Sequence, residues 1–308
     1  MTHLDYLNQN YPVRKSTEQK QSFRDYIVQS LAKKGIEARV ETTKDGKNNN
    51  IVIGDPTKAK AVFTAHYDTP ARSIFPNIMI PKNKLIFYAY QFVPVLFLVA
   101  VSLLVGYLVG NLILKSYEAF YISFMVAYYG LFFGIMRGFT NKFNYNDNTS
   151  GVATVLSVID GLSADELQNF AFILFDNEEK GKKGSAAYYK DHADDMKGRF
   201  LVNFDCVGNG NNVIFIAQKD AVNSSEYELL KKSFAEKDGF LLDFCSYKEG
   251  QSNSDHKNFP KGVACVACKK TNNGLLYTPN IHTSRDIVAS NENIDFITEN
   301  TLSFIRKI

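Results

Sequence analysis

A long apolar block at residues 85–136 constrains this chain more than any other feature of its sequence. Its first half, Gln91 to Leu114, contains no charged side chain, and its second half, Ala119 to Met136, contains none either. A helix needs about 20 residues, at ~1.5 Å per residue, to cross the hydrocarbon core of a bilayer. Each half is long enough for one crossing, so the block predicts a two-helix transmembrane hairpin.

The charges around the hairpin predict its orientation. Basic residues lie on both outer flanks, at Lys82, Lys84, Arg137 and Lys142, whereas the turn between the two arms carries one lysine and one glutamate. By the positive-inside rule, both flanks and the soluble part of the chain stay in the cytoplasm. The segment Met1 to Lys20 is polar, so we expect no cleavable export signal. The chain is predicted to be a multi-pass protein of the cell membrane.

Other uses of the apolar block stay open at this point: a hairpin buried in the protein core, a dimerisation arm or a re-entrant segment. A core helix rarely needs about 20 uncharged residues in succession, and two in tandem are hard to bury. Pro94 could kink or begin the first arm, and Tyr128 and Tyr129 would lie deep in the second. We expect residues 85–136 to contact the lipid bilayer, and a homodimer is a further use of the same arms.

The hairpin interrupts what we expect to be one soluble domain, formed by residues 1–84 and 137–308. Without residues 85–136, roughly 250 residues of the 308-residue chain remain, which suits a single α/β domain. The formal net charge of +3 and the absence of a basic stripe predict no nucleic-acid partner. Four cysteines fit a reducing compartment, and we expect Cys265 and Cys268 to be buried strand residues.

Outside the hairpin, strand patterns alternate with helix patterns. Strands are predicted at residues 36–42, 50–54, 60–64, 170–175, 200–204, 212–217, 240–245 and 262–268. Helices are predicted at residues 16–34, 152–162, 185–192, 225–237 and 293–306. This alternation predicts an α/β fold with a mostly parallel, mixed sheet flanked by helices.

Polar side chains follow several of these strands. His66 comes at the end of the strand at 60–64, Glu178 and Glu179 follow the strand at 170–175, and Asp205 follows the strand at 200–204. In open α/β sheets, ligands collect at the carboxyl ends of the strands. We therefore expect these side chains to converge at one edge of the sheet.

Two imidazoles and three carboxylates are the candidate metal ligands: His66, Asp147, Glu179, Asp205 and His282. Five ligands are too many for one catalytic zinc ion, which keeps a position open for water or substrate. They suit two ions that share one carboxylate. We expect two Zn²⁺, although Co²⁺ or Mn²⁺ would also fit these ligands.

Two more acidic residues are candidates for catalytic roles. Asp68 lies two residues after His66 and could accept a hydrogen bond from the other imidazole nitrogen, while Glu178 could act as general base beside Glu179. Each has a plainer interpretation. The first pair could be a hydrogen bond at a strand end, and adjacent glutamates are more often a solvated charge pair.

Six segments, taken together and in this order, resemble the successive signatures of the co-catalytic dizinc aminopeptidases, metallopeptidase family twenty-eight: Thr64–Thr69, Asp147–Gly151, Asn177–Glu179, Asn203–Asp205, Ser254–His256 and Ile281–Asp286. The resemblance covers the soluble chain from about Asn50 to the C-terminus. It implies a fold of the zinc aminopeptidase (phosphorylase/hydrolase-like) type, in a membrane-anchored, bacterial-type member of the family.

The resemblance also implies a role for each ligand. Asp147 would bridge the two metal ions and be followed by a strained, cis peptide bond. His66 and Asp205 would complete one ion, and Glu179 and His282 the other.

The implied activity is that of a zinc-dependent exopeptidase, an aminopeptidase that removes N-terminal residues from peptides. Glu178 would act as general base and proton shuttle while a metal-bridging water attacks the peptide carbonyl. The substrate's free N-terminus would lie near the same acidic cluster. Because the insertion brings the rim of the site close to the bilayer, we hypothesise either that the substrates are peptides at the inner membrane surface or that the hairpin serves simply for anchoring or dimerisation.

Some positions depart from the family pattern or have no assigned role. Ile281 stands where some relatives have a tyrosine that helps to stabilise the oxyanion. His256 is expected to shape the site without binding metal, and His3 and His192 are expected at the surface. The lysines of residues 180–183 are expected in a solvated loop, with contact to a substrate carboxylate or to lipid headgroups left open.

Three competing functions follow from the same residues. A carboxypeptidase would need a cationic clamp for the substrate C-terminus, for which Arg72 and Arg285 are candidates. A glutaminyl cyclase, as the resemblance implies, would use one zinc ion, so five ligands count against it. A non-catalytic, membrane-anchored scaffold would typically have lost ligands, and none is missing here.

Overall fold

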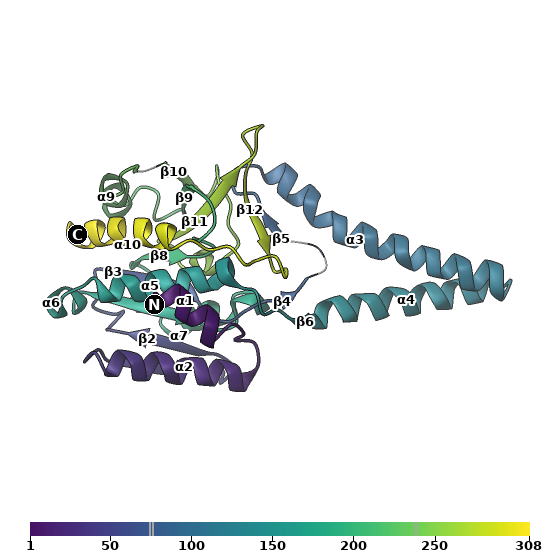
Figure 1. Ribbon diagram of the computed structural model, residues 1–308, viewed down its shortest axis with the longest axis horizontal. Helices are drawn as coiled ribbons and strands as arrows, with labels where there is room; N and C mark the ends of the chain where they lie inside the picture. The colour runs from purple at the N-terminus through teal and green to yellow at the C-terminus, as the bar shows by residue number, and fades with distance from the viewer. Residues whose placement is uncertain (74, 76, 238) are drawn as a thin grey trace.

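The computed structural model describes residues 1–73, 75, 77–237 and 239–308, with residues 135–137 described by their backbone alone. Within these residues, ten strands form one sheet in the order β1-β2-β7-β3-β8-β11-β12-β5, and β9 and β10 extend it from β11 (Figure 1). The strands are β1 (Ala38–Thr42), β2 (Asn49–Ile53), β3 (Ala61–His66), β5 (Asn77–Met79), β7 (Phe170–Phe175), β8 (Phe200–Phe204), β9 (Asn212–Ala217), β10 (Leu241–Ser246), β11 (Gly262–Lys270) and β12 (Leu276–Ile281). A separate pair, β4 (Ala71–Arg72) and β6 (Phe139–Thr140), lies near the base of the hairpin.

The centre of the sheet is parallel and buried. β3 pairs in parallel with β7 and β8, and β8 pairs in parallel with β11. Every residue of β3, β7 and β8 is buried, as expected of parallel strands covered on both faces. Because these strands point the same way, the residues that follow them lie at one edge of the sheet.

Helices cover both faces of the sheet. The α-helices outside the hairpin, among the described residues, are α1 (His3–Asn10), α2 (Thr17–Ala32), α5 (Gly151–Asp160), α6 (Ala164–Leu167), α7 (Lys183–Asp191), α8 (Ala193–Met196), α9 (Ser225–Ser233) and α10 (Asn291–Ile305). One core cluster joins a face of the sheet to α1, α2, α5, α9 and α10, with Phe23, Val155 and Phe304 among its members. A second cluster joins the opposite face to α7 and α8 through Tyr188 and Met196.

The α/β fold predicted from the sequence is confirmed, and the bounds of β7, β8 and β9 are those expected. Some elements were missed. β12 contains Pro279 and shows no alternating apolar pattern, and β5 is only three residues long. The helix expected at residues 225–237 ends at Ser233, and α1 was not expected at all.

The apolar block forms a helical hairpin that projects away from the sheet (Figure 1). Its first arm is α3 (Lys84–Gly106), which continues as the π-helix η1 (Tyr107–Ile113), and its second arm is α4 (Tyr117–Arg137). The two arms approach closely at Gly110, where a Cβ atom would lie 2.3 Å from Cα of Phe120. A residue larger than glycine would force the arms apart at this point.

The surface of the hairpin is apolar and exposed. Only 17% of the most apolar 18-residue stretch of the helix Lys84–Ile113 is buried. This arm of the hairpin is therefore not part of the protein core. By length and composition this is the one helix, in the described part of the chain, that could cross a membrane.

The predicted pair of transmembrane helices is therefore supported for the first arm only. In α4, Glu118 and several tyrosines lower the apolar character of the described residues, and the end of the predicted second span, at residues 135–136, lies outside the described side chains. That the second arm crosses a membrane stays a prediction.

Candidate metal centre and active site

The five residues with metal-binding side chains come together at the carboxyl edge of the sheet. His66 ends β3, Asp205 directly follows β8, and His282 directly follows β12. Glu179 lies in the short 3-10 helix after β7, and Asp147 lies in the turn that leads into α5. The parallel strands β3, β7 and β8 explain why His66, Glu179 and Asp205 meet, because their carboxyl ends lie at one edge of the sheet. β12 runs antiparallel to β11 and brings His282 back to the same place.

Asp147 lies between the two histidines. Its Oδ1 is 3.3 Å from Nε2 of His66, and its Oδ2 is 3.0 Å from Nε2 of His282. Asp205 Oδ1 lies 3.8 Å from Nε2 of His66, and Glu179 Oε2 lies 3.3 Å from Nε2 of His282. The arrangement has two halves, each with one imidazole and one carboxylate of its own, and Asp147 contributes one oxygen to each half.

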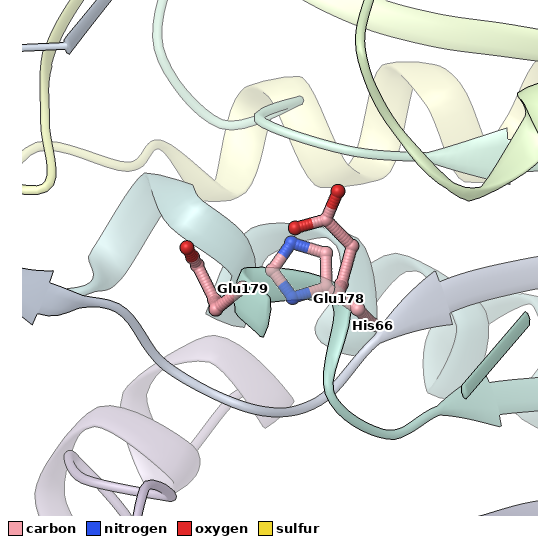
Figure 2. Close-up of side chains that lie close together, drawn as sticks. All are labelled: His66, Glu178 and Glu179. Atoms are coloured by element: carbon pink, nitrogen blue, oxygen red, sulfur yellow. The ribbon is translucent and has the colours of Figure 1, made fainter. Parts of the chain in front are cut away.

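Three groups of side chains have ligand atoms within 4.8 Å of one another and could hold a metal ion: His66, Asp147 and Asp205; Asp147, Glu179 and His282; and His66, Glu178 and Glu179. The first two are the sets that the family resemblance implied, and they share Asp147. Figure 2 shows the third group, in which Glu178 and Glu179 lie beside the ring of His66.

The chemistry of this cluster fits divalent cations. Oε1 of Glu179 is buried and has no hydrogen-bond partner among the described residues. A buried carboxylate oxygen without a partner is costly, and a cation would satisfy it. Imidazole nitrogens and carboxylate oxygens are also the ligands that zinc and similar ions prefer.

Asp68 holds the acidic turn that follows β7. Its carboxylate accepts the backbone N–H of Glu178 at 2.9 Å and that of Glu179 at 3.2 Å. The sequence suggested that this carboxylate would face the ring of His66, but the nearer partner of His66 Nδ1 is the backbone carbonyl of Asp68, at 3.1 Å, with the carboxylate at 3.6 Å. A proton on Nδ1 would leave Nε2 free to bind a metal ion.

Two further side chains fix the position of Asp147. Asp286 accepts the backbone N–H of Asp147 at 3.0 Å and that of Asn146 at 3.2 Å. The Asp147–Asn148 peptide bond is cis, as expected, and Asn148 donates to the carbonyl of Phe204 at 3.0 Å. Asn148 thereby ties the turn that carries Asp147 to the end of the strand that precedes Asp205.

Arg14 supports the site through hydrogen bonds, a role that no pattern in the sequence predicted. Its side chain is fully buried, and it donates to the carbonyl of Tyr67 at 2.5 Å and to Oγ1 of Thr149 at 3.1 Å. Burial lowers the pKa of Arg14 to about 10, while the carboxylates of Asp68 and Asp147 act in the opposite direction. Arg14 thus joins two of the signature segments and supplies a positive charge next to them.

The electrostatics of the site favour a protonated Glu178 in the absence of a cation. Burial raises the pKa of Glu178 well above its usual range, and Asp255 and Glu179 raise it further, against the opposing effect of His66. Burial likewise raises the pKa of Glu179, helped by the charge of Asp147. A carboxyl group with a raised pKa can both accept and return a proton near neutral pH.

The cluster lies in a cavity of about 490 Å³. Besides the cluster, its walls include the first turns of α3, the strand β5 and two basic loops. From α3 come Phe87, Tyr88 and Gln91, so the base of the hairpin forms part of the cavity wall. Ligand-binding cavities in proteins commonly measure ~300–1,000 Å³, so this one can hold a small peptide.

Two lysines line the cavity, and the sequence had left open whether the lysines of residues 180–183 contact a substrate. Of the lysines at residues 180–183, Lys182 lines the cavity, together with Lys257 from the short helix η4 (Asp255–Asn258). Neither Arg72 nor Arg285 is among the residues that line it.

The remaining histidines lie outside the metal-binding groups found among the described residues. His256 is fully buried, burial lowers its pKa to about 3, and neither of its ring nitrogens has a hydrogen-bond partner in the described part of the chain. His3 pairs with Asp160 at 2.8 Å, and His192 pairs with Glu41. The four cysteines are free and buried, as expected for Cys265 and Cys268 in β11.

Comparison with known proteins agrees with this arrangement. The sequence profile of peptidase family M28 matches residues 140–305, which is more than half of the 308-residue chain. The chain therefore belongs to peptidase family M28 and is a hydrolase of the metallopeptidase type. A search of curated proteins finds no match.

Several solved structures share the fold. The LapA aminopeptidase of Legionella pneumophila superposes with a TM-score of 0.57 at 15% identity, over 99% of this chain and 67% of that one. A Zn-dependent exopeptidase from Parabacteroides distasonis gives 0.55 at 13% identity, over 99% and 96% of the two chains. The glutaminyl cyclase of Porphyromonas gingivalis gives 0.54 at 13% identity, over 99% and 97%. At these identities the similarity shows the fold.

Proposed function

We propose that this protein is a zinc-dependent aminopeptidase that removes N-terminal residues from peptides. The observation that supports this most directly is the position of Asp147, which offers one carboxylate oxygen to each of two histidines. Two metal-binding halves that share one carboxylate suit a dinuclear centre. Membership of a peptidase family and the zinc-dependent exopeptidase among the similar structures support the same reaction.

In this proposal, His66, Asp147 and Asp205 would hold one zinc ion, and Asp147, Glu179 and His282 would hold a second. When bound, the zinc ions polarise the peptide carbonyl and lower the pKa of the attacking water.

Glu178 carries the proton in the proposed reaction. It lies within 4.8 Å of the ligand atoms of His66 and Glu179, and its backbone is fixed by the carboxylate of Asp68. Its carboxylate takes a proton from the attacking water and returns it to the amine that leaves when the peptide bond breaks. Asp68 acts as a positioning residue, because it holds the turn that carries both glutamates.

We propose that the peptidase domain consists of residues 1–84 and 137–308 and that the hairpin, residues 85–136, anchors it to the cell membrane. An apolar helix with so little buried surface is unfavourable in water, and a bilayer would cover it. Basic residues on both flanks of the hairpin support a cytoplasmic location for the peptidase domain. Because Phe87 and Tyr88 line the cavity, substrates at the inner membrane surface would have short access to it.

The test uses the full chain in detergent, loaded with zinc, and a set of aminoacyl-nitroanilides. We expect cleavage of substrates with a free amino group, no cleavage of their N-acetylated forms, and two zinc ions per chain. Glu178→Gln should lower kcat by about 10³-fold or more while metal content is kept, because proton transfer is lost but the ligands remain.

Other outcomes would point to the competing functions. Equal cleavage of blocked and free substrates would contradict the aminopeptidase proposal. One zinc ion per chain with cyclisation of N-terminal glutamine would indicate a glutaminyl cyclase. Absence of both metal and hydrolysis would indicate a scaffold.

A further inference from the structure

The cavity contains a second charged feature that the proposed reaction does not use. Lys182 and Lys257 line the same cavity as the acidic cluster. Lys182 Nζ donates to Oδ1 of Asn253 at 2.9 Å, and Lys257 Nζ donates to the same oxygen at 3.4 Å. The two ammonium groups lie near each other because they share one neutral acceptor, the amide oxygen of Asn253.

Among the described residues, neither ammonium group of this pair forms an ion pair. In the described part of the chain, no carboxylate lies within ion-pair distance of either ammonium, and the partner that they share is the amide of Asn253. The pKa of Lys257 is lowered, first by partial burial and then by the positive charges of Lys182 and Lys84. Like charges held together in this way attract an anion, because the anion relieves their repulsion.

The surrounding loops hold the pair in place. The backbone N–H of Lys182 donates to the carbonyl of Glu178 at 2.7 Å, which fixes the first lysine relative to the proposed base. The carbonyl of Lys182 accepts the side-chain amide of Asn258, one residue after Lys257, at 3.3 Å. The two loops are thereby joined to each other and to the turn that carries Glu178 and Glu179.

We propose that Lys182 and Lys257 bind the C-terminal carboxylate of the substrate, and that this makes short peptides the preferred substrates. The inference rests on the proposed aminopeptidase function. A peptide that places its amino end at the acidic cluster and its carboxylate at the lysines must fit within one cavity of about 490 Å³. A longer peptide would carry its carboxylate past the lysines and lose this contact.

The experiment compares one tripeptide, trialanine, in four forms: both ends free, N-acetylated, C-amidated and blocked at both ends. In the zinc-loaded full-length protein, amidation should lower kcat/KM by about 10-fold or more, mainly through KM, because a charged hydrogen bond is lost. In the double variant Lys182→Met/Lys257→Met, the free peptide should fall to the rate of the amide, while the rate of the amide itself should not change. Lys183→Met, an exposed neighbour that does not line the cavity, is the matched control and should behave as wild type.

The outcomes separate this inference from the proposed function. Equal kcat/KM for the free and amidated peptides in the wild type would overturn the carboxylate site and leave the aminopeptidase intact. A loss with Lys183→Met as large as that of the double variant would also overturn it, since the effect would then be one of general charge. Cleavage of the N-acetylated, free-carboxylate peptide would instead overturn the aminopeptidase proposal. Hydrolysis of the amide serves as an internal check that each variant is folded.

Discussion

The cavity at the candidate metal centre buries charged side chains, whereas the hairpin exposes apolar ones. In the cavity, carboxylates such as that of Asp147 are buried, and the guanidinium of Arg14, which contacts the segment that carries Asp147, is buried as well. On the hairpin, large apolar side chains such as Leu96 and Val126, each 67% exposed, face outward. Burying charge is costly unless the charge is paired, and exposing a large apolar surface to water is costly as well. Metal ions would compensate the buried carboxylates of the cavity, and a bilayer, as we propose, would cover the exposed apolar surface of the hairpin.

The two regions meet in the first turns of α3. Phe87, Tyr88 and Gln91 belong to the helix that continues into the exposed apolar arm, and they also line the cavity. The first turns of α3 therefore line the cavity, and the rest of the same helix belongs to the exposed arm. The predictions below test whether the two regions can be separated.

The largest effect is expected at Asp147. Asp147→Asn removes the negative charge shared by both halves of the centre, so we expect kcat/KM to fall by about 10³-fold or more and bound zinc to fall below one ion per chain. Metal analysis and peptide hydrolysis measure this, with exposed Asp165→Asn as the charge-matched control. Full activity with two bound ions would show that Asp147 does not bridge the ions.

The second prediction separates the outer hairpin from the cavity. Replacing residues 98–133 by a flexible Gly–Ser linker removes most of the exposed apolar surface but keeps the turns that line the cavity. We expect the protein to move from the membrane to the soluble fraction, a change of about 100-fold in partition, while kcat/KM for short peptides stays within about threefold. Continued sedimentation with membranes would contradict the proposed anchor.

The third prediction concerns the pH dependence of stability in the metal-free protein. Burial raises the pKa of Asp255 to about 7, compared with ~4 in an unfolded chain. The folded state therefore keeps a proton that the unfolded state has lost, and stability falls as pH rises through this window. Between pH 5 and pH 8 we expect the free energy of unfolding of the chelated wild type to fall by roughly 2–3 kcal/mol more than that of Asp255→Asn. Parallel pH curves for the two proteins would show that Asp255 does not contribute.

The smallest effect is expected at the junction of the two regions. Phe87→Ala removes a large side chain from the cavity wall and so enlarges the cavity. We expect KM to change by about five- to tenfold for peptides with a bulky first residue and to change little for peptides that begin with alanine. Phe92→Ala, on the same helix but 63% exposed and away from the cavity, should leave the kinetics unchanged. Equal behaviour of the two variants would confine the role of the hairpin to anchoring.

Much of the fold could be predicted because its central strands are apolar throughout. Phe170–Phe175 and Phe200–Phe204 stand out as buried strands, and the residues that follow them include Glu179 and Asp205. Metal-binding residues placed directly after buried strands could therefore be expected to meet before any distance was known. The parallel order of the strands brings them together.

Other parts of the site could not be predicted, because they depend on contacts between segments far apart in the chain. Arg14 contacts Thr149, 135 residues away, and no local pattern marks either residue. The carboxylate of Asp68 binds the backbone of the turn at Glu178, which depends on how that turn is folded. Lys182 looked like one lysine in a solvated loop, and its place in the cavity depends on Asn253 in a different loop.

The position of the hairpin along the chain has a consequence for biosynthesis. Of the five side chains at the proposed metal centre, the ribosome makes only His66 before the hairpin, and Asp147, Glu179, Asp205 and His282 follow it. The hairpin is therefore synthesised before a second ligand exists. During translation, the hairpin is available for membrane insertion while the enzyme is still inactive, so hydrolysis can begin only after synthesis has passed residue 282.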